Sequence, residues 1–502
     1  MTRLRGILLL LCALALLTPL AAACDDGKPS VDERFAAFLD AWRKADFTGF
    51  QDLLTQQGRT LNPAAAKELL AGTEGDLSAR RPALTPHGKA VVQAADATLS
   101  VGVSWPLPDG RTWTYDTKVA ARLLGQRWQL YLGASTVNPG LEDGEHLALR
   151  STPAKRGIVT AADDSPIVSD TPVVYVGVEP QRVPDVAGLV RHLDAVFRSV
   201  QVEVDVQGLP AKLQAAKPDA FVDVVTLRRS DYAQIARDLG AAEGVRTRDG
   251  VLPLPLTRTF ARALLGTSGT VTRELIDAGQ GALKPGDIAG LTGLQRRYDT
   301  RLRGLPGVQI VALDKGPGRE LFTLPAQDGA TVATTIDPRV QKAADAAIAT
   351  TAKPSALVAL RVGDGAVLAA ANGPGAAGYN LAFLGEVPGP AWPADPAALG
   401  VGARWDALGA DVFTGRTAQS GVVAAPVGYA AAAAALSRGK WQDPVLVKGG
   451  KPAAPGPVVS GTLSVPGLSV GVRGDIAYCV YVTDAGHDVT DPIAEAFLAA
   501  IR

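Results

Sequence analysis

The sequence predicts a multidomain α+β protein, and three observations lead to this class. The chain has 502 residues, and at about 150 residues per domain this corresponds to about three domains. Hydrophobic residues make up 47% of the chain and charged residues 20%, which is enough apolar material for packed cores and excludes global disorder. Near the start, an amphipathic helical pattern is followed by a series of alternating strands, as in an α+β cone.

Residues 1–23 predict a lipoprotein signal peptide. Arg3 and Arg5 precede an uninterrupted apolar run over 6–17, and small residues then lead to Cys24. A cysteine in this place is diacylated before cleavage in bacterial lipoproteins, so we expect Cys24 to carry lipid and to anchor the protein at the extracytoplasmic face of the cell membrane. The alternatives are an ordinary cleaved signal or a membrane-spanning anchor. The short apolar run and the charged residues that follow it at once favour the lipoprotein.

The remaining cysteines predict no disulfide. Cys12 leaves with the signal and Cys24 carries lipid, so Cys479 has no partner. Cys479 lies in an apolar sequence and is expected to be a small core residue.

Residues 24–149 are predicted to form the first domain. Its opening helix is indicated by Phe35, Phe38, Leu39 and Trp42, which recur at helical spacing. Strands are expected at 97–105, 112–124 and 128–132, with a turn at 106–110. The aromatic side chains are expected to pack in the core rather than to line a ligand cavity; they are Phe35, Phe38, Trp42, Trp105, Trp113 and Trp128.

Residues 150–328 and 329–502 are predicted as the second and third domains. The second mixes strand patterns, such as 172–178, with helical patterns, such as 186–197. The third is expected to contain strands at 356–361 and 366–371, a loop at 373–389, an alanine-rich helix at 428–437, a hairpin at 468–483 and a closing helix from 491.

The order of short motifs along the chain resembles class B penicillin-binding proteins. The motifs WQLYL (128–132), VNPGL (137–141) and PAKRGI (153–158) resemble the junction between the nuclear-transport-factor-2-like domain and the pedestal of that family. The motifs FARALLG (260–266), GLQRRYD (293–299) and LRGLPG (302–307) are similar to the pedestal itself. TTID (334–337) with QKAA (341–344) resembles the entry to the transpeptidase domain.

This resemblance implies a fold for each domain. The first is a nuclear-transport-factor-2-like cone, the second a penicillin-binding-protein dimerisation or pedestal domain, and the third a shortened transpeptidase of the serine β-lactamase-like α/β type. The activity of the family is peptidoglycan D,D-transpeptidation by an acyl-enzyme route.

The residues that would perform this acyl transfer are missing from the expected place. The chemistry needs a serine nucleophile and, three residues later, a lysine that accepts its proton. In the stretch that resembles this motif, Pro390 stands at the serine position and Pro393 at the lysine position. Neither is a nucleophile or a base, and two prolines disfavour a helix there. Segment 397–400 resembles one that lies beyond the family's S-x-N loop, so that loop is expected to be deleted.

The strand that anchors the substrate carboxylate has lost its cation. The family's K-T-G-T is matched by Val459, Ser460, Gly461 and Thr462, without a lysine. We therefore regard the following as degenerate site positions: Pro390, Pro393, Val459, Ser460 and Gly461.

Two other patterns imitate the missing motifs. Ser437 and Lys440 form an S-x-x-K, but they end the alanine-rich helix beside Gly439, a helix stop, far past the expected place. Lys448 and Gly449 imitate a K-T-G within a predicted loop. We interpret both as coincidental.

Other chemistries have less support. No G-x-S-x-G nucleophile motif occurs, and no metal or other cofactor is expected, because His87, His146, His192 and His487 are isolated from ligand-spaced partners. Asp163 with Asp164 is interpreted as a solvated turn rather than a metal site. Lys plus Arg is 50 and Asp plus Glu is 50, a formal net charge of +0, so no nucleic-acid partner is expected.

These observations predict a lipid-anchored penicillin-binding-protein homologue with an inactive transpeptidase domain. We expect it to act in cell-wall assembly by binding or scaffolding, with peptidoglycan or cell-wall synthesis proteins as partners. One alternative is an active D,D-transpeptidase that uses Ser437 with Lys440, or another serine. A second alternative is a regulatory decoy that binds peptidoglycan stems or muropeptides without acylation.

Overall fold

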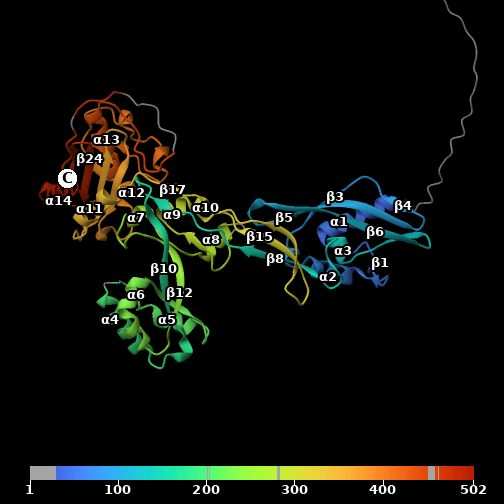
Figure 1. The fold of residues 1–502 in the computed structure, drawn as a ribbon. Coiled ribbons are helices and arrows are strands. Elements are labelled where there is room, and N and C mark those ends of the chain that lie inside the picture. Colours follow the sequence, from blue (N-terminus) through green and yellow to red (C-terminus); the bar gives the residue numbers. More distant parts are fainter. Residues whose placement is uncertain (1–29, 201, 203, 280–282, 450–457, 462) are drawn as a thin grey trace, which may run out of the picture. The chain divides into compact units, whose positions relative to one another are not determined.

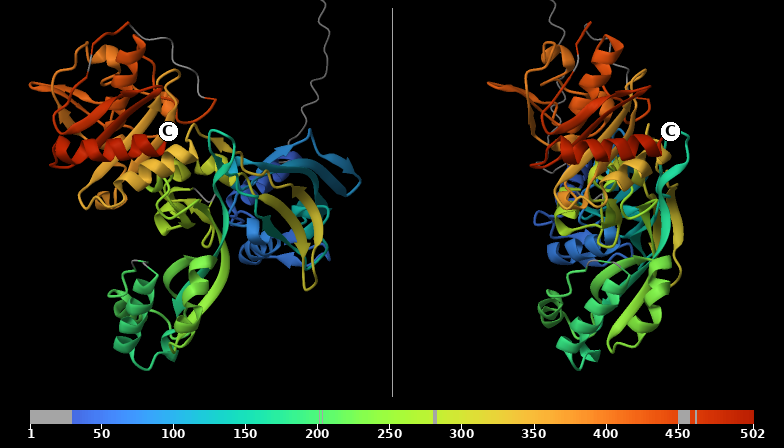
Figure 2. Two further views of the ribbon diagram at one scale, coloured as in Figure 1. Left: turned by 60° about the vertical axis from the view of Figure 1, so that its left-hand side comes forward. Right: turned by 90° about the vertical axis from the view of Figure 1, so that its left-hand side faces the viewer.

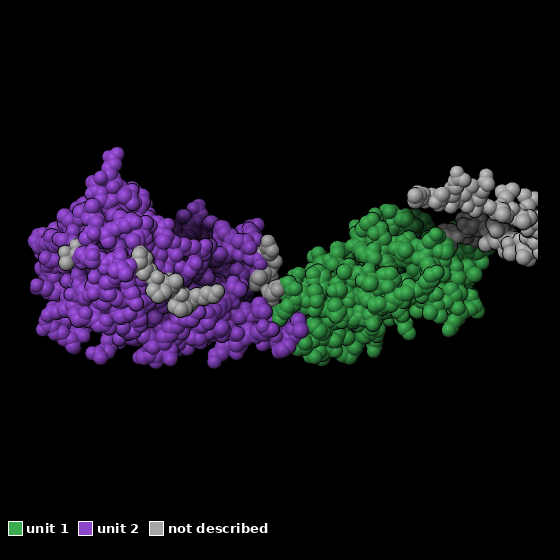
Figure 3. Space-filling model, turned by 90° about the horizontal axis from the view of Figure 1, so that it is seen from above, with its two compact units in different colours: residues 1–150, 309–323 green, residues 151–308, 324–502 purple. Residues whose placement is uncertain are grey.

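The computed structural model describes residues 30–200, 202, 204–279, 283–449, 458–461 and 463–502. It divides into two compact units (Figure 3). Unit 1 comprises residues up to Arg150 together with Gln309–Thr323, and unit 2 comprises Ser151–Val308 and Leu324–Arg502. Cys24 and the predicted signal peptide lie outside the described residues.

Unit 1 opens with two helices that carry their own caps. Helix α1 (Val31–Lys44) begins after Ser30, whose side chain accepts a hydrogen bond from the backbone of Glu33 while the Glu33 carboxylate accepts one from the backbone of Ser30. This is a capping box. Helix α2 (Pro63–Glu74) begins after Asn62, whose side chain accepts a hydrogen bond from a backbone N–H of the first turn.

The main sheet of unit 1 is antiparallel and is built on a long hairpin. Strands β5 (Asp96–Pro106) and β6 (Thr112–Leu124) pair from Asp96↔Arg122 to Pro106↔Thr112. Strands β3 and β4 pair with β5, and β7 pairs with β6. The remaining elements are β1 (Leu53–Leu54), β2 (Thr60–Leu61), β3 (Ala83–Pro86), β4 (Val91–Gln93), β7 (Arg127–Leu130), α3 (Ala134–Val137) and β8 (His146–Thr152).

The predicted helix and strands of this unit are confirmed, with one difference. The strand expected at 128–132 ends at Leu130, because Leu132 instead donates its N–H to the carbonyl of Leu54. Five of the six aromatic side chains are buried, as expected, whereas Trp128 is only half-buried.

The segment 309–323 belongs to unit 1, although the sequence boundaries place it in the second domain. Strands β15 (Gly307–Leu313) and β16 (Arg319–Leu324) form a sheet with β8. The Phe322 ring stacks on Trp113 with centroids 5.8 Å apart. Strand pairing and aromatic packing therefore bring this later segment back to the first unit.

In unit 2, the long strand β10 (Pro166–Val178) organises the first half. It pairs with β11 (Val222–Arg228) on one side and with β12 (Val245–Pro255) on the other. Figures 1 and 2 show β10 and β12 running together toward the helices α4 (Val186–Ser199), α5 (Leu209–Ala215) and α6 (Arg229–Gly240).

Short elements complete this half of unit 2. Strand β9 joins β10 to β17 within the same sheet. These elements are β9 (Val159–Thr160), α7 (Arg262–Leu265), β13 (Ser268–Thr270), α8 (Arg273–Ala278), β14 (Ile288–Gly290), α9 (Gly293–Arg297), α10 (Asp299–Arg303) and β17 (Val332–Ala333).

The second half of unit 2 has three layers. An antiparallel sheet has the order β19-β18-β24-β23, and its side chains alternate between two faces. Val358 and Cys479 face α13, whereas Leu357 and Val480 face α11 and α14. The elements are α11 (Pro338–Ile348), β18 (Ser355–Arg361), β19 (Val367–Asn372), α13 (Pro426–Arg438), β23 (Leu468–Arg473), β24 (Ile476–Val482) and α14 (His487–Ala500).

The expected loop at 373–389 is wrong in part. It contains a short helix, α12 (Leu381–Leu384), and a strand, β20 (Val387–Gly389), which pairs with β22 (Gly421–Ala424). The pattern did not indicate β20, because Pro388 and Gly389 are poor strand formers that tertiary pairing overrides. Strand β21 (Arg416–Ala418) completes this small sheet.

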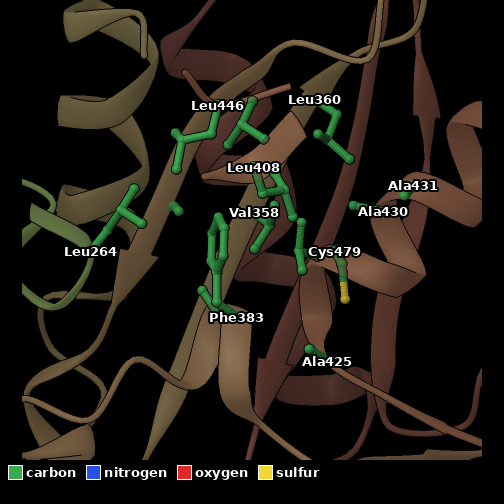
Figure 4. Packing of buried hydrophobic residues seen from close by; sticks show 14 of the residues in the cluster. Leu264, Val358, Leu360, Phe383, Leu408, Ala425, Ala430, Ala431, Leu446 and Cys479 are labelled. Atoms are coloured by element: carbon green, nitrogen blue, oxygen red, sulfur yellow. The ribbon is translucent and has the colours of Figure 1, made fainter. Parts of the chain in front are cut away.

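One hydrophobic core joins the two halves of unit 2. Figure 4 shows Leu264 of α7 in the same cluster as Phe383 and Val358. Cys479 belongs to this cluster and is 0% exposed, with no disulfide, which confirms its prediction as a core residue.

Candidate degenerate acyl-transfer site

The stretch that resembles the nucleophile motif is not helical. Strand β20 ends at Gly389, and no helix lies between Leu384 and Ala397, all of which the structure describes. Pro390 is half-buried and Pro393 is exposed. The structure therefore has no helical turn that would hold side chains 390 and 393 side by side.

The stretch expected to be the anchoring strand is also irregular, which corrects that expectation. Val459 is buried, whereas Ser460 and Gly461 are exposed and belong to no strand. The Val459 N–H donates to the carbonyl of Gly439 at 3.0 Å, and Val458 bridges Lys440. This backbone is thus bonded to the end of α13 rather than to the edge strand β23.

The two degenerate stretches nevertheless meet in space. A Cβ built on Gly461 would lie 2.6 Å from Cβ of Pro393, so these residues are in direct contact. A Cβ on Gly421 would overlap the carbonyl groups of Gly389 and Pro390, so the backbone of β22 lies directly against the end of β20. The residues that correspond to two separate catalytic motifs therefore pack against each other.

Helix α13 supports this arrangement. The Tyr429 hydroxyl lies 2.9 Å from the carbonyl oxygen of Val387 and 3.0 Å from that of Val422, so it links β20 and β22 to the helix. Trp392, which is 7% exposed, packs on the Tyr429 ring with centroids 5.5 Å apart. Burial raises the pKa of Tyr429, so its hydroxyl stays protonated and donates a hydrogen bond.

Ser437 and Lys440 do not form a catalytic pair in the structure. Both are exposed, and neither side chain has a hydrogen-bond or ion-pair partner among the described residues. Ser437 lies in the last turn of α13. The negative end of the helix dipole there disfavours an alkoxide.

The amine of Lys448 is engaged in structural contacts. Its Nζ donates to the carbonyl of Ala162 and pairs with Asp164, both at 2.8 Å. Asp163 accepts hydrogen bonds from the backbone and hydroxyl of Ser165, so the predicted turn is confirmed. Within the described ranges, no group of His, Cys, Asp and Glu side chains has a metal-binding arrangement.

Two carboxyl groups, the partly buried Asp345 and the buried Glu74, were not singled out in the sequence. Asp345 of α11 accepts hydrogen bonds from the backbone N–H of Ala261 at 3.2 Å and from Gln341 at 3.0 Å, and burial raises its pKa to about 7. Glu74 accepts one from the Trp42 indole at 2.9 Å, and burial raises its pKa to about 7 as well. For Asp345, the available signal was Gln341 four residues earlier on the same helix, a spacing that places both side chains on one face.

The thiol of Cys479 is unsuited to nucleophilic chemistry. Burial raises its pKa, so the reactive thiolate is not formed at neutral pH.

Comparison with known families assigns most of the chain to two domains. Residues 30–145 match the model of the NTF2-like N-terminal transpeptidase domain, and residues 151–334 match that of the penicillin-binding protein dimerisation domain. No curated protein matches the sequence. The predicted first two domain folds are confirmed.

These two domains in this order define a class of cell-wall proteins. The chain belongs to the class B penicillin-binding-protein-like family. Among the described residues, none of the helices has the length and apolarity needed to cross a bilayer.

Proposed function

We propose that this protein is a lipid-anchored member of its family that binds other cell-wall components and does not transfer acyl groups. The contact of Pro393 with Gly461 carries this proposal. The Pro393 ring lies against the Gly461 backbone, and neither residue carries a nucleophile, a base or a cation.

Acyl transfer needs three groups in reach of one another. A hydroxyl attacks the carbonyl carbon, a base takes the hydroxyl proton, and a cation holds the substrate carboxylate. Pro390, Pro393 and Val459 stand where the family has these groups. Ser460 is the one hydroxyl among the degenerate positions, and no described lysine or histidine is hydrogen-bonded to it.

The alternative that uses Ser437 is disfavoured by its geometry. The Ser437 hydroxyl has no base bonded to it among the described residues, and its place in the last helical turn is electrostatically wrong for a nucleophile. The muropeptide decoy remains compatible with a protein that binds without reacting.

Lipid anchoring at Cys24 is part of the proposal and rests on the sequence of the signal region. With it, the NTF2-like and dimerisation domains act outside the cytoplasmic membrane, where peptidoglycan and its synthesis proteins are the available partners.

Acylation by a β-lactam tests the absence of chemistry. The purified mature protein is incubated with a fluorescent penicillin, and the intact mass is measured beside an active class B penicillin-binding protein. We expect an adduct on the active protein and none on this one. A stoichiometric adduct would overturn the proposal, and its loss in Ser437→Ala would assign it to that serine.

A further inference from the structure

The first half of unit 2 contains a large cavity far along the sequence from the degenerate site. Its volume is about 1130 Å³, and it is lined by β10, β11 and β12 together with residues of the 257–270 segment. Small-molecule sites usually have about 300 to 1,000 Å³, so this cavity has room for an extended segment of chain.

The floor of the cavity is one face of the sheet, formed there by β10, β11 and β12. Val174, Val176 and Val178 of β10 point into the core that α4, α5 and α6 cover. Because side chains alternate along a strand, Tyr175 points to the opposite face, which the helices leave open. Its register partners are Thr226 of β11 and Arg248 of β12.

Two glycines leave the room that lets aromatic rings lie against this face. A Cβ on Gly250 would overlap the Tyr175 ring, and one on Gly177 would lie 2.5 Å from the Phe221 ring. The Arg248 guanidinium lies 4.0 Å from the centroid of Phe221. The rings therefore present flat surfaces with an arginine stacked on one of them.

Two carboxylates of the cavity are already paired with arginines. Asp231 pairs with Arg258 at 2.6 Å, and Asp249 pairs with Arg229 at 2.5 Å, so these two carboxylates are neutralised.

Two arginines of the cavity, Arg248 and Arg262, have no carboxylate partner among the described residues. Arg228 lies near Asp231, a carboxylate that Arg258 already pairs. Arg228 is half-buried and donates to the carbonyl of Pro255, and burial lowers its pKa. Asp223 is the one lining carboxylate without a partner among the described residues. The lining thus holds four arginines and three aspartates, an excess of one positive charge.

We propose that this cavity binds an acidic, extended peptide segment of a partner protein. Carboxylate side chains pair with Arg228, Arg248 and Arg262, since guanidinium groups hold carboxylates through paired hydrogen bonds. Aliphatic side chains of the segment pack on Tyr175, Leu252 and Leu254. Arginine and aromatic residues are enriched at protein interfaces.

The experiment measures binding of a fluorescein-labelled, glutamate-rich peptide of about 12 residues that contains leucines. Fluorescence anisotropy is recorded with wild type, Arg228→Glu, Arg262→Glu and the control Arg191→Glu. Arg191 lies on α4 with an exposed side chain, so this variant has the same change in net charge outside the cavity. Arg262 is also exposed, so its replacement keeps the fold if Arg228→Glu unfolds.

We expect binding to wild type and Arg191→Glu, and a loss of affinity of about tenfold or more in the cavity variants. Equal losses in all three variants, or no binding to wild type, would overturn the proposal. Binding of inorganic polyphosphate in place of the peptide would also overturn it and would indicate a phosphate polymer. The β-lactam result has no bearing on this site, so the two proposals succeed or fail separately.

Discussion

Asp345 is held where an ionised carboxylate is unfavourable. Burial raises its pKa to about 7, well above the value of about 4 that an aspartate has in an unfolded chain. Between these values the folded protein retains a proton that the unfolded chain has lost. Stability therefore decreases as the pH rises from about 4 to 7. Above the folded pKa the carboxylate is ionised in both states, and the full cost of burying its charge then lowers the free energy of unfolding.

Replacing Asp345 with Asn removes this pH dependence. The amide keeps an oxygen that accepts the Ala261 hydrogen bond and carries no charge. We expect the variant to exceed wild type in free energy of unfolding by about 1 to 2 kcal/mol at pH 8 and to match it near pH 4. Urea unfolding at both pH values measures this. Glu74 titrates in the same range, so the difference between the two proteins is the informative quantity, and a constant difference across pH would contradict the prediction.

At the scale of elements, Tyr429 ties a small sheet to helix α13. Its buried hydroxyl lies within hydrogen-bond distance of carbonyls from β20 and β22. We expect Tyr429→Phe to lower the free energy of unfolding by about 1 to 2 kcal/mol, because buried carbonyls lose their donor. Tyr379→Phe is the control, since the Tyr379 hydroxyl also donates to a carbonyl but is exposed to water. Equal effects of the two substitutions would argue against a role for burial.

The stretch that resembles the nucleophile motif lacks a helical turn as well as a serine and a lysine. Because residues 390–396 form no helix, the double variant Pro390→Ser with Pro393→Lys is expected to remain unreactive toward a fluorescent penicillin. The double variant would also keep Val459 at the position that resembles the family's anchoring lysine. Intact mass measures the outcome, and an adduct that peptide mapping places at position 390 of the double variant would show that two side chains suffice.

Sequence patterns predicted the long elements because each carries its own signal. Helix α1 has a capping box and a regular apolar face, and β6 has strict alternation over its whole length. Strand β20 and the irregular backbone at Val459 carried no such signal, since pairing with distant residues determines them. The motif comparison did place Pro393 and Gly461 in one site, and the structure brings them together.

At the scale of the whole molecule, the two compact units are not continuous segments of the sequence. Unit 1 needs the hairpin of β15 and β16, which follows the first half of unit 2 in the sequence. Unit 2 shares one core between its two halves, from Leu264 to Cys479. The C-terminal half of unit 2 therefore helps to stabilise the half that matches the dimerisation domain.

The membrane attachment of this whole assembly is expected to depend on one thiol. Cells that express the protein are grown with an alkyne-tagged palmitate, and lipid incorporation is read on a gel. We expect label in wild type and in Cys479→Ala, because that thiol is buried in the core, and none in Cys24→Ala. Label that persists in Cys24→Ala would place the lipid elsewhere. An unlabelled wild type would leave a cleaved signal or a spanning anchor as the means of export.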